Sequence, residues 1–529
     1  MRFFNTAGPV NPQDHYCLPP LERFDLDEIL RLIDQKKYFV LHAPRQVGKT
    51  TFLLALRDYL NQQGDYRCLY FNVEIAQTAR DDVAQAMQYI WSEIVEWARI
   101  TLQDDFPASL QPQTLRDYGG SFLHVLLTRW AEQSPRPMIL LIDEIDSLVG
   151  DSLISVLRQL RAGYTRRPEH FPQSIILCGV RDVRDYRLRS SEGKELVTGG
   201  SAFNIKAKSL RLGDFAREEV ETLYQQHTAE TGQVFTAEAL EWMWTLAQGQ
   251  PWLVNALAYE TCFELKAGRD RCQPITAAMV AEAKEALILR RETHLDQLTD
   301  KLREERVRQV ISPILQGGTI DEATQRDNIQ YVMDLGLVKR GPEGLQIANS
   351  LYREIIPREL TVITQINLES QYRVAWYVQP DGRLDVPGLL TAFQQFFREH
   401  SEHWLQRFEY QEAGPQLLMQ AFLQRIVNGG GRVEREYGLG RGRTDLLVWW
   451  PYGGGVGVQK AVIELKLLHK SLDATIEEGL AQTFAYMDRC QAAEGHLVIF
   501  DRRSGRSWED KIFQRVEPYQ NTLITVWGM

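Results

Sequence analysis

The sequence predicts an α/β protein: a parallel β-sheet covered on both faces by helices, then helical units, then a second and smaller α/β domain. Apolar runs typical of buried strands alternate with helical segments across residues 38–212. From residue 411 onward strand and helix patterns alternate again. At 529 residues, the chain has room for about three or four domains.

The expected strands of the first sheet are short and strongly apolar. They fall at residues 38–44, 68–74, 138–143, 174–180 and 208–212. An amphipathic helix is expected between residues 21 and 37, where Leu26, Ile29, Leu30 and Ile33 recur at helical spacing, and another at about 50–61. Strands separated by helices predict parallel pairing.

After Asp214 the strand patterns stop. Residues 214–290 predict a helical bundle, and residues 300–360 predict two helices followed by a short hairpin around Gly341–Gly344. This is the order of a winged helix-turn-helix, although an ordinary helical cap fits the same string. A connecting helix is expected at Val386–Phe408.

Composition limits the class of protein. Apolar residues make up 44% of the chain and charged residues 25%, as in ordinary globular proteins. No apolar run is long enough for a bilayer, and six cysteines are scattered without a C-x-x-C pair, so we expect reduced thiols, a cytoplasmic location and no membrane partner. The net charge of −10 does not favour nucleic acid, but a local basic groove suffices to bind it.

A phosphate-binding pattern follows the first expected strand. Residues 43–50 (APRQVGKT) fit a P-loop, with Ala43 in place of the first glycine. In such a loop Lys49 reaches the β- and γ-phosphates and Thr50 ligates Mg²⁺. The predicted nucleotide-binding residues here are Ala43, Pro44, Arg45, Gln46, Val47, Gly48, Lys49, Thr50 and Thr51. The alternative is a strand–loop–helix corner that binds nothing.

Two carboxylates end the expected strand at 138–143. Asp143 would hold Mg²⁺ through its water shell, and Glu144 would orient and deprotonate the attacking water. The strand expected at Cys68–Glu74 lies between the two motifs in the sequence, which fits ATPases with a catalytic glutamate, because these insert a strand between the motifs. A solvated acidic turn is the alternative for these carboxylates.

Residues 10–360 resemble prokaryotic AAA-like, STAND-related P-loop ATPases. The resemblance rests on HAPRQVGKT (42–50), LLIDEID (140–146), GVRDVRD (179–185) and GQPWLV (249–254). It implies that Gly249 and Pro251 of a helical lid lie near the nucleotide and that Arg181 or Arg184 senses the γ-phosphate. The expected divisions are an ATPase core (1–213), a lid (214–295), a winged-helix-like unit (296–360) and a connector (361–410).

A second candidate site combines two carboxylates and a lysine. Asp445 is followed by Glu464 and Lys466, which alternate onto one face of an apolar strand. The midpoint between positions 445 and 464 falls between Gly454 and Gly455, so a hairpin turning there would place Asp445 opposite Glu464. Two carboxylates and a lysine beside a divalent cation suit phosphodiester hydrolysis. A solvated pair on an edge strand is the alternative.

Residues 411–529 resemble a PD-(D/E)XK nuclease domain, with the likeness carried by about residues 411–501. The resemblance implies that Asp445, Glu464 and Lys466 are catalytic, that Asp445 and Glu464 ligate metal, and that Gln482, followed by Tyr486, faces the same site. One departure is the first helix, where many members have a glutamate and this chain has Gln416 and Gln420. Glu434 or Glu436 could compensate.

These readings combine into an ATP-dependent, Mg²⁺-dependent DNA nuclease, with Mg²⁺ at both sites and Mn²⁺ able to substitute at the nuclease site. The resemblances imply a role in mobile elements or antiviral defence. RNA remains an alternative substrate, and the winged-helix region is a candidate surface for a partner protein or a second copy. The competing hypothesis is a nucleotide-driven, DNA-binding switch or scaffold whose nuclease-like domain is silent.

Overall fold

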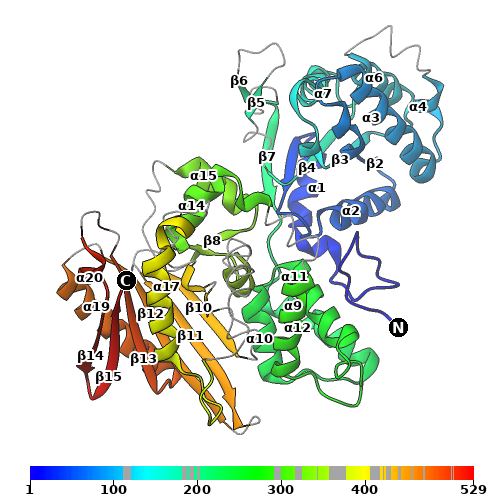
Figure 1. The fold of residues 1–529 in the computed structure, drawn as a ribbon. Helices are drawn as coiled ribbons and strands as arrows, with labels where there is room; N and C mark the ends of the chain where they lie inside the picture. Colours follow the sequence, from blue (N-terminus) through cyan, green and yellow to red (C-terminus); the bar gives the residue numbers. More distant parts are fainter. Residues whose placement is uncertain are drawn as a thin grey trace. The chain divides into compact units, whose positions relative to one another are not determined.

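The computed structural model divides the chain into two compact units, Met1–Leu287 and Ile288–Met529. It describes residues 1–110, 121–181, 187–189, 196–198, 203–290, 300–315, 325–341, 344–356, 377–405, 418–420, 422–423, 431–438, 443–453, 457–468, 471–501, 503 and 506–529. Each unit is described by itself below (Figure 1).

The first unit contains a five-stranded sheet in the order β2-β3-β4-β1-β7, and every neighbouring pair is parallel. The strands are β1 (Tyr38–His42), β2 (Arg67–Asn72), β3 (Met138–Asp143), β4 (Ser174–Gly179) and β7 (Lys206–Arg211). The predicted α/β class and parallel sheet are therefore confirmed.

The order of the strands in the sheet differs from their order in the sequence. The strand between β1 and β3 in the sheet is β4, whereas β2 lies at the edge, outside β3. The strand that lies between β1 and β3 in the sheet is therefore not the strand that lies between them in the sequence. Since β1 and β3 are not neighbours, the loops that follow them are separated by the width of β4.

Helices cover both faces of this sheet because successive strand residues point to opposite sides. On one face Phe39, Leu41 and Ile176 pack with α1 (Leu26–Asp34) and α2 (Lys49–Gln63). On the other face Val40 and Leu140 pack with α3 (Val83–Trp97), α6 (Phe122–Gln133) and α7 (Gly150–Ala162). Short helical turns lie at Pro20–Arg23 (η1), Glu74–Ala79 (η2), Ala98–Leu102 (η3), Phe106–Ser109 (α4), Ile145–Ser147 (η5) and Tyr164–Arg166 (η6). Two short strands, β5 (Arg187–Arg189) and β6 (Leu196–Thr198), pair antiparallel outside the main sheet.

A group of helices follows the sheet, as predicted from residue 214 onward. They are α9 (Arg217–Thr231), α10 (Ala237–Ala247), α11 (Pro251–Tyr259), a π-helical turn at Glu260–Glu264 and α12 (Ala277–Arg290). We call α9–α11 the lid.

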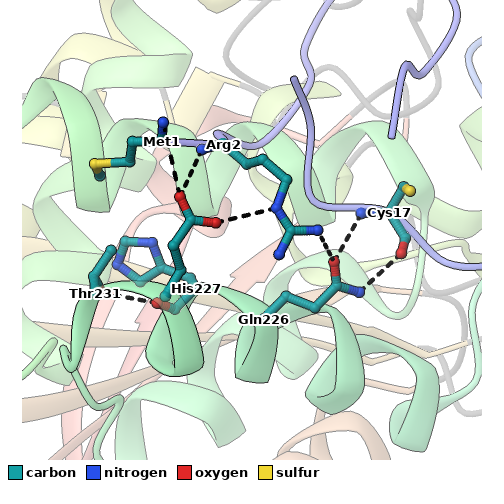
Figure 2. A network of polar contacts seen from close by, with 7 residues as sticks. Met1, Arg2, Cys17, Gln226, His227 and Thr231 are labelled. Atoms are coloured by element: carbon teal, nitrogen blue, oxygen red, sulfur yellow. Dashed lines mark hydrogen bonds and ion pairs between the residues drawn. The ribbon is translucent and has the colours of Figure 1, made fainter. Parts of the chain in front are cut away.

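The first residues of the chain pack against α9. Phe4 and Tyr16 are buried and lie next to His227 in a cluster of aromatic rings. Figure 2 shows the polar edge of this contact: Gln226 pairs with the backbone of Cys17, accepting from its N–H at 3.2 Å and donating to its carbonyl at 2.8 Å, and Arg2 donates to Glu230. The segment is thus part of the folded unit.

The second unit begins with the predicted order of helix, helix and hairpin. These elements are α14 (Glu305–Leu315), α15 (Arg326–Asp334), β8 (Val338–Gly341) and β9 (Gly344–Ile347), and Gly341 pairs with Gly344 at the turn. The connecting helix is α17 (Val386–Leu405).

The larger sheet of the second unit is mixed, in the order β10-β11-β12-β13-β15-β14. Its strands are β10 (Arg432–Gly438), β11 (Arg443–Tyr452), β12 (Gly457–Leu467), β13 (Glu494–Phe500), β14 (Phe513–Tyr519) and β15 (Thr522–Gly528). Helix α19 (Leu472–Cys490) packs Ile476 and Leu480 against one face of this sheet. On the other face, Phe397 of α17 lies 5.3 Å from the ring of Phe500. A short helix, α20 (Trp508–Lys511), precedes β14.

Two further expectations can be compared with the described residues. All six cysteines lie in described segments, and each is a free thiol. Among the helices of those segments, none combines the length and apolar character that crossing a bilayer requires.

Candidate nucleotide site and candidate metal site

The loop between β1 and α2 is a tight turn with two left-handed residues, Gln46 (φ 58°) and Gly48 (φ 95°). Gly48 is the N-cap of α2, and glycine adopts this backbone conformation without steric cost. Helix α2 therefore begins at the loop, so its first backbone N–H groups are available for an anion.

Ala43, where the P-loop pattern has glycine, fits the loop without strain. Its φ is not positive, and its N–H donates to the carbonyl of Gly179 at 3.2 Å. Its methyl group is buried with Val47 and Leu212 in a small core that Phe24 also contacts. An alanine is therefore accommodated, because this position does not need a left-handed backbone.

Lys49 lies over the loop. Its side chain is largely buried, and Nζ donates to the carbonyl oxygens of Ala43 (3.1 Å) and Pro44 (3.0 Å). Of the other loop residues, Arg45 and Gln46 are exposed. Thr51 faces the N-terminal segment, where its hydroxyl accepts from the N–H of Val10 at 3.1 Å.

Asp143 is fully buried and receives three hydrogen bonds. The Thr50 hydroxyl donates to Oδ2 at 2.7 Å, the Tyr70 hydroxyl donates to Oδ2 at 3.2 Å, and the Glu144 N–H donates to Oδ1 at 2.9 Å. Burial and the Asp143 carboxylate raise the pKa of Tyr70, which keeps its hydroxyl protonated. The adjacent hydroxyl and carboxylate oxygens of Thr50 and Asp143 are hard donors that fit Mg²⁺.

Glu144 has an uncommon backbone conformation, with φ 53° and ψ 40°. A left-handed non-glycine residue costs about 1–3 kcal/mol and often marks a functional site. Burial raises the pKa of its carboxyl group; Lys49 lowers this pKa, and the carboxylates of Asp146 and Asp143 raise it further. A half-buried carboxylate with a raised pKa is a suitable proton acceptor.

Asp146 connects the ends of two strands, a role that the sequence did not reveal. Its Oδ1 accepts from the N–H of Val180 at 3.1 Å. A Cβ added at Gly179 would lie only 2.5 Å from the same oxygen. The turn that carries Glu144 is thereby held against the end of β4, where Arg181 follows. Arg184 lies outside the described residues.

Gly249 has a structural requirement of its own. Its φ is 79°, its carbonyl accepts from the N–H of Phe215 at 2.8 Å, and an added Cβ would lie 2.0 Å from the Phe215 carbonyl oxygen. Pro251 is the first residue of α11, and Gln250 caps that helix by accepting from Leu253 at 2.6 Å. The glycine therefore permits close packing of the lid, and its proximity to nucleotide remains a prediction.

In the second unit, the backbone register confirms the predicted hairpin pairing. Asp445 of β11 is the register partner of Glu464 of β12. The turn itself and the side chain of Asp445 lie outside the described residues, as do the side chains of Glu434 and Glu436.

Glu464 and Lys466 are both buried on the α19 side of the sheet. Lys466 Nζ lies 3.5 Å from Oε1 of Glu464 and also 3.5 Å from Oε1 of Glu478 on α19. Gln482, one turn after Glu478, donates to that same Glu478 oxygen at 3.5 Å. The structure therefore brings Glu464 and Lys466 together, and Gln482 is connected to Lys466 through Glu478. It adds Glu478, which the sequence did not single out.

The Glu464 carboxylate fits a cation. It is fully buried, and neither of its oxygens receives a hydrogen bond from a described residue. Lys466 Nζ lies 3.5 Å away but is shared with Glu478, and a buried carboxylate without hydrogen-bond donors is costly, so a cation would be favourable beside it. Among the side chains that the structure describes, no three His, Cys, Asp or Glu residues form a metal-binding group. Tyr486 is buried, and Arg489 lies over its ring at 4.6 Å.

The sequence matches no protein-family model and no curated protein. Among solved structures, a Walker-type ATPase of Pyrococcus abyssi is 14% identical with a TM-score of 0.46, over 67% of this chain and 99% of that chain. Cdc6p from Pyrobaculum aerophilum is 14% identical (TM-score 0.36), over 66% of this chain and 95% of its own. The RuvB Holliday junction branch migration motor of Thermotoga maritima is 14% identical (TM-score 0.34), over 63% and 96%.

Such distant likenesses carry no functional argument by themselves. The class of the first unit follows from its own geometry: the parallel sheet, the glycine-capped loop at the start of α2, and the Thr50–Asp143 pair define a P-loop nucleotide-binding fold.

Proposed function

We propose that the first unit binds ATP with Mg²⁺ and hydrolyses it. The observation that carries the proposal is the 2.7 Å hydrogen bond from Thr50 to the buried Asp143, because it joins the hydroxyl of the phosphate loop to the carboxylate at the end of β3. When bound, Mg²⁺ would neutralise charge on the phosphate oxygens.

The chain's own residues supply the remaining chemistry. The backbone of residues 43–49 and the start of α2 hold the phosphates, and Lys49 exchanges its loop carbonyl partners for phosphate oxygens. Glu144 orients a water and accepts its proton, and Arg181 contacts the γ-phosphate.

Nucleotide binding and phosphate release test this proposal. Lys49→Ala should abolish both binding of a fluorescent ATP analogue and phosphate release. Lys266→Ala, which removes an exposed lysine of the same unit, should leave both unchanged. Equal activity of the Lys49 variant and the wild type would refute the proposal.

We further propose that the second unit is a Mg²⁺-dependent DNA nuclease of the PD-(D/E)XK kind, controlled by the ATPase. The Asp445–Glu464 register and the buried Glu464 carboxylate beside Lys466 support it. Asp445 and Glu464 would hold the cation, which lowers the pKa of bound water. Lys466 would stabilise the attacking oxygen, and Gln482 would face the same site.

Plasmid, linear duplex and single-stranded DNA, and RNA in parallel, incubated with Mg²⁺ or Mn²⁺ test the nuclease. Asp445→Ala and Lys466→Ala should abolish cleavage. Lys511→Ala, which removes the partly exposed lysine at the end of α20, should not. Cleavage that survives in both site variants would belong to a contaminant and would end the proposal.

The alternative is a nucleotide-driven switch or scaffold whose nuclease-like domain is silent. The net charge of −10 and the glutamines at positions 416 and 420 favour it. Calorimetric titration with Mg²⁺ separates the two: a hydrolytic site loses a binding event in Glu464→Ala, whereas a silent domain has none to lose. The winged-helix region and a possible homo-oligomer are candidates for partner contacts in either case.

A further inference from the structure

Arg23 joins three parts of the first unit that are distant in the sequence. Its Nη1 donates to the carbonyl of Val47, in the phosphate-binding loop, at 3.3 Å. Its Nη2 donates to the carbonyl of Gly213, between β7 and the lid, at 2.7 Å. Its guanidinium lies over the ring of Phe215, 4.3 Å from the centroid. One side chain therefore contacts the loop, the connection to the lid and a buried aromatic ring.

The loop side of this contact is anchored by packing. Phe24, the next residue, contacts the small core of Ala43, Val47 and Leu212. The ring of Phe24 also lies 4.5 Å from that of Phe52, on α2. Arg23 is therefore held beneath the loop, and a shift of the Val47 carbonyl must move or break its hydrogen bond.

The residues that Arg23 contacts next to the lid are also held in place by close packing. Phe215 donates its N–H to the carbonyl of Gly249, and the two backbones are so close that only glycine fits at position 249. Gly249 lies two residues before Pro251, which begins α11. Burial lowers the pKa of Arg23, and the carboxylates of Glu219 and Asp214 act in the opposite direction, so acidic groups near the start of the lid also face it.

We propose that Arg23 is a positioning residue that transmits nucleotide occupancy of the phosphate loop to the lid. The inference rests on the proposed nucleotide binding, but it makes a separate claim. A phosphate that reorganises residues 43–49 changes the position of the Val47 carbonyl, and Arg23 passes this change to Gly213, Phe215 and, through the Phe215–Gly249 contact, to the start of α11.

The shape of the arginine side chain suits this role better than that of lysine. A guanidinium presents several N–H donors in a fixed plane, so it can bond two carbonyls while its face stacks on an aromatic ring. A lysine ammonium at this position can keep one carbonyl but cannot stack in the same way. Arg23→Lys should therefore retain charge and lose coupling.

Hydrogen exchange measured by mass spectrometry, with and without ADP and Mg²⁺, tests this. In the wild type, ADP should slow exchange both in residues 43–52 and in the lid segments 213–217 and 247–253. In the two lid segments the expected slowing is about 5–150-fold, the range usual for coupled sites. In Arg23→Ala and Arg23→Lys, the loop should still be slowed, but the lid segments should change less than about twofold, outside that range. Arg57→Ala is the matched control, because Arg57 stacks on Trp97 away from the lid.

Phe215→Leu provides an independent route, since it removes the ring while leaving the contacts of Arg23 to Val47 and Gly213. It should lose the lid response as well, and it decides the question if the Arg23 variants fold poorly or lose ADP. Undiminished lid protection in Phe215→Leu and in a folded Arg23 variant overturns the inference. A wild type that binds no ADP instead refutes the proposed nucleotide function.

Discussion

Thr50 donates its hydroxyl hydrogen to Oδ2 of Asp143 across 2.7 Å, although the two residues are 93 positions apart. Thr50 lies in the first turn of α2, after β1, and Asp143 is the last residue of β3; β4 separates these two strands in the sheet. The parallel sheet brings the ends of these strands to one edge, where a magnesium–phosphate complex needs both a hydroxyl and a carboxylate.

Asp143→Asn should weaken binding of the magnesium–nucleotide complex by about 10–100-fold, the usual cost of removing an outer-shell partner of a metal. The amide retains the size of the side chain, and its oxygen can still accept from Thr50, but its NH2 group cannot accept from the Glu144 N–H. Urea unfolding of the variant is therefore measured beside binding. Titrations with a fluorescent ATP analogue, with Mg²⁺ and with EDTA, measure the binding. The loss should appear only with Mg²⁺, and the exposed Asp65→Asn should show none.

Glu144→Gln should keep ATP affinity and lose hydrolysis by about 10²–10⁴-fold, because the amide cannot accept a proton from water. Single-turnover phosphate release measured beside equilibrium binding separates the two effects. A variant with normal phosphate release would show that another group activates the water.

Glu464→Gln should abolish stabilisation by Mg²⁺ in urea unfolding, because the amide removes the buried carboxylate, while Lys466 keeps Glu478 as an ion-pair partner 3.5 Å away. In the wild type Mg²⁺ should raise the unfolding midpoint, and in the variant it should not. Glu478→Gln, whose side chain is 44% exposed, should change stability by less than about 1 kcal/mol. A Glu464→Gln protein that Mg²⁺ stabilises as much as it stabilises the wild type would show that Glu464 is not a metal ligand.

His227 should make the first unit sensitive to acid. In the folded protein, burial lowers the pKa of its imidazole below the ordinary value of 6.5. As the pH falls, the unfolded chain therefore takes up the proton first. The contribution to stability is therefore complete above pH 6.5 and is lost as the pH falls below it, by up to about 1.4 kcal/mol per pH unit. Urea unfolding between pH 7.5 and 5.5 measures the slope, which should be smaller in His227→Gln than in the wild type or in exposed His170→Gln. Equal slopes in all three proteins would contradict the assignment.

Much of the fold followed from local patterns in the sequence. The strands β1, β3 and β4 are continuous apolar runs bounded by polar residues, and their burial on both faces explains why they were recognisable. Strand β14 was missed because it is an edge strand that is mostly exposed and mixed in polarity. The order of strands in the sheet depends on tertiary pairing, which local sequence patterns do not specify.

The residues of the candidate sites also fall into two groups: those that lie in recognisable sequence motifs and those that do not. Lys49, Thr50 and Asp143 lie in contiguous motifs, and the glycine-centred symmetry correctly predicted that Asp445 pairs with Glu464. Arg23 and Glu478 gave no such signal. Arg23 reaches a carbonyl 190 positions away, and Glu478 matters only because α19 packs against the face of β12 that carries Lys466.

We propose that nucleotide bound to the first unit controls DNA cleavage by the second. The most direct measurement is the rate of DNA cleavage with Mg²⁺ in the presence of ATP, ADP, a non-hydrolysable ATP analogue or no nucleotide, for the wild type, Lys49→Ala and Asp445→Ala. We expect wild-type cleavage to change with the nucleotide, Lys49→Ala to cleave at one rate in all four conditions, and Asp445→Ala not to cleave. No cleavage by the wild type, or equal cleavage by Asp445→Ala, would contradict it.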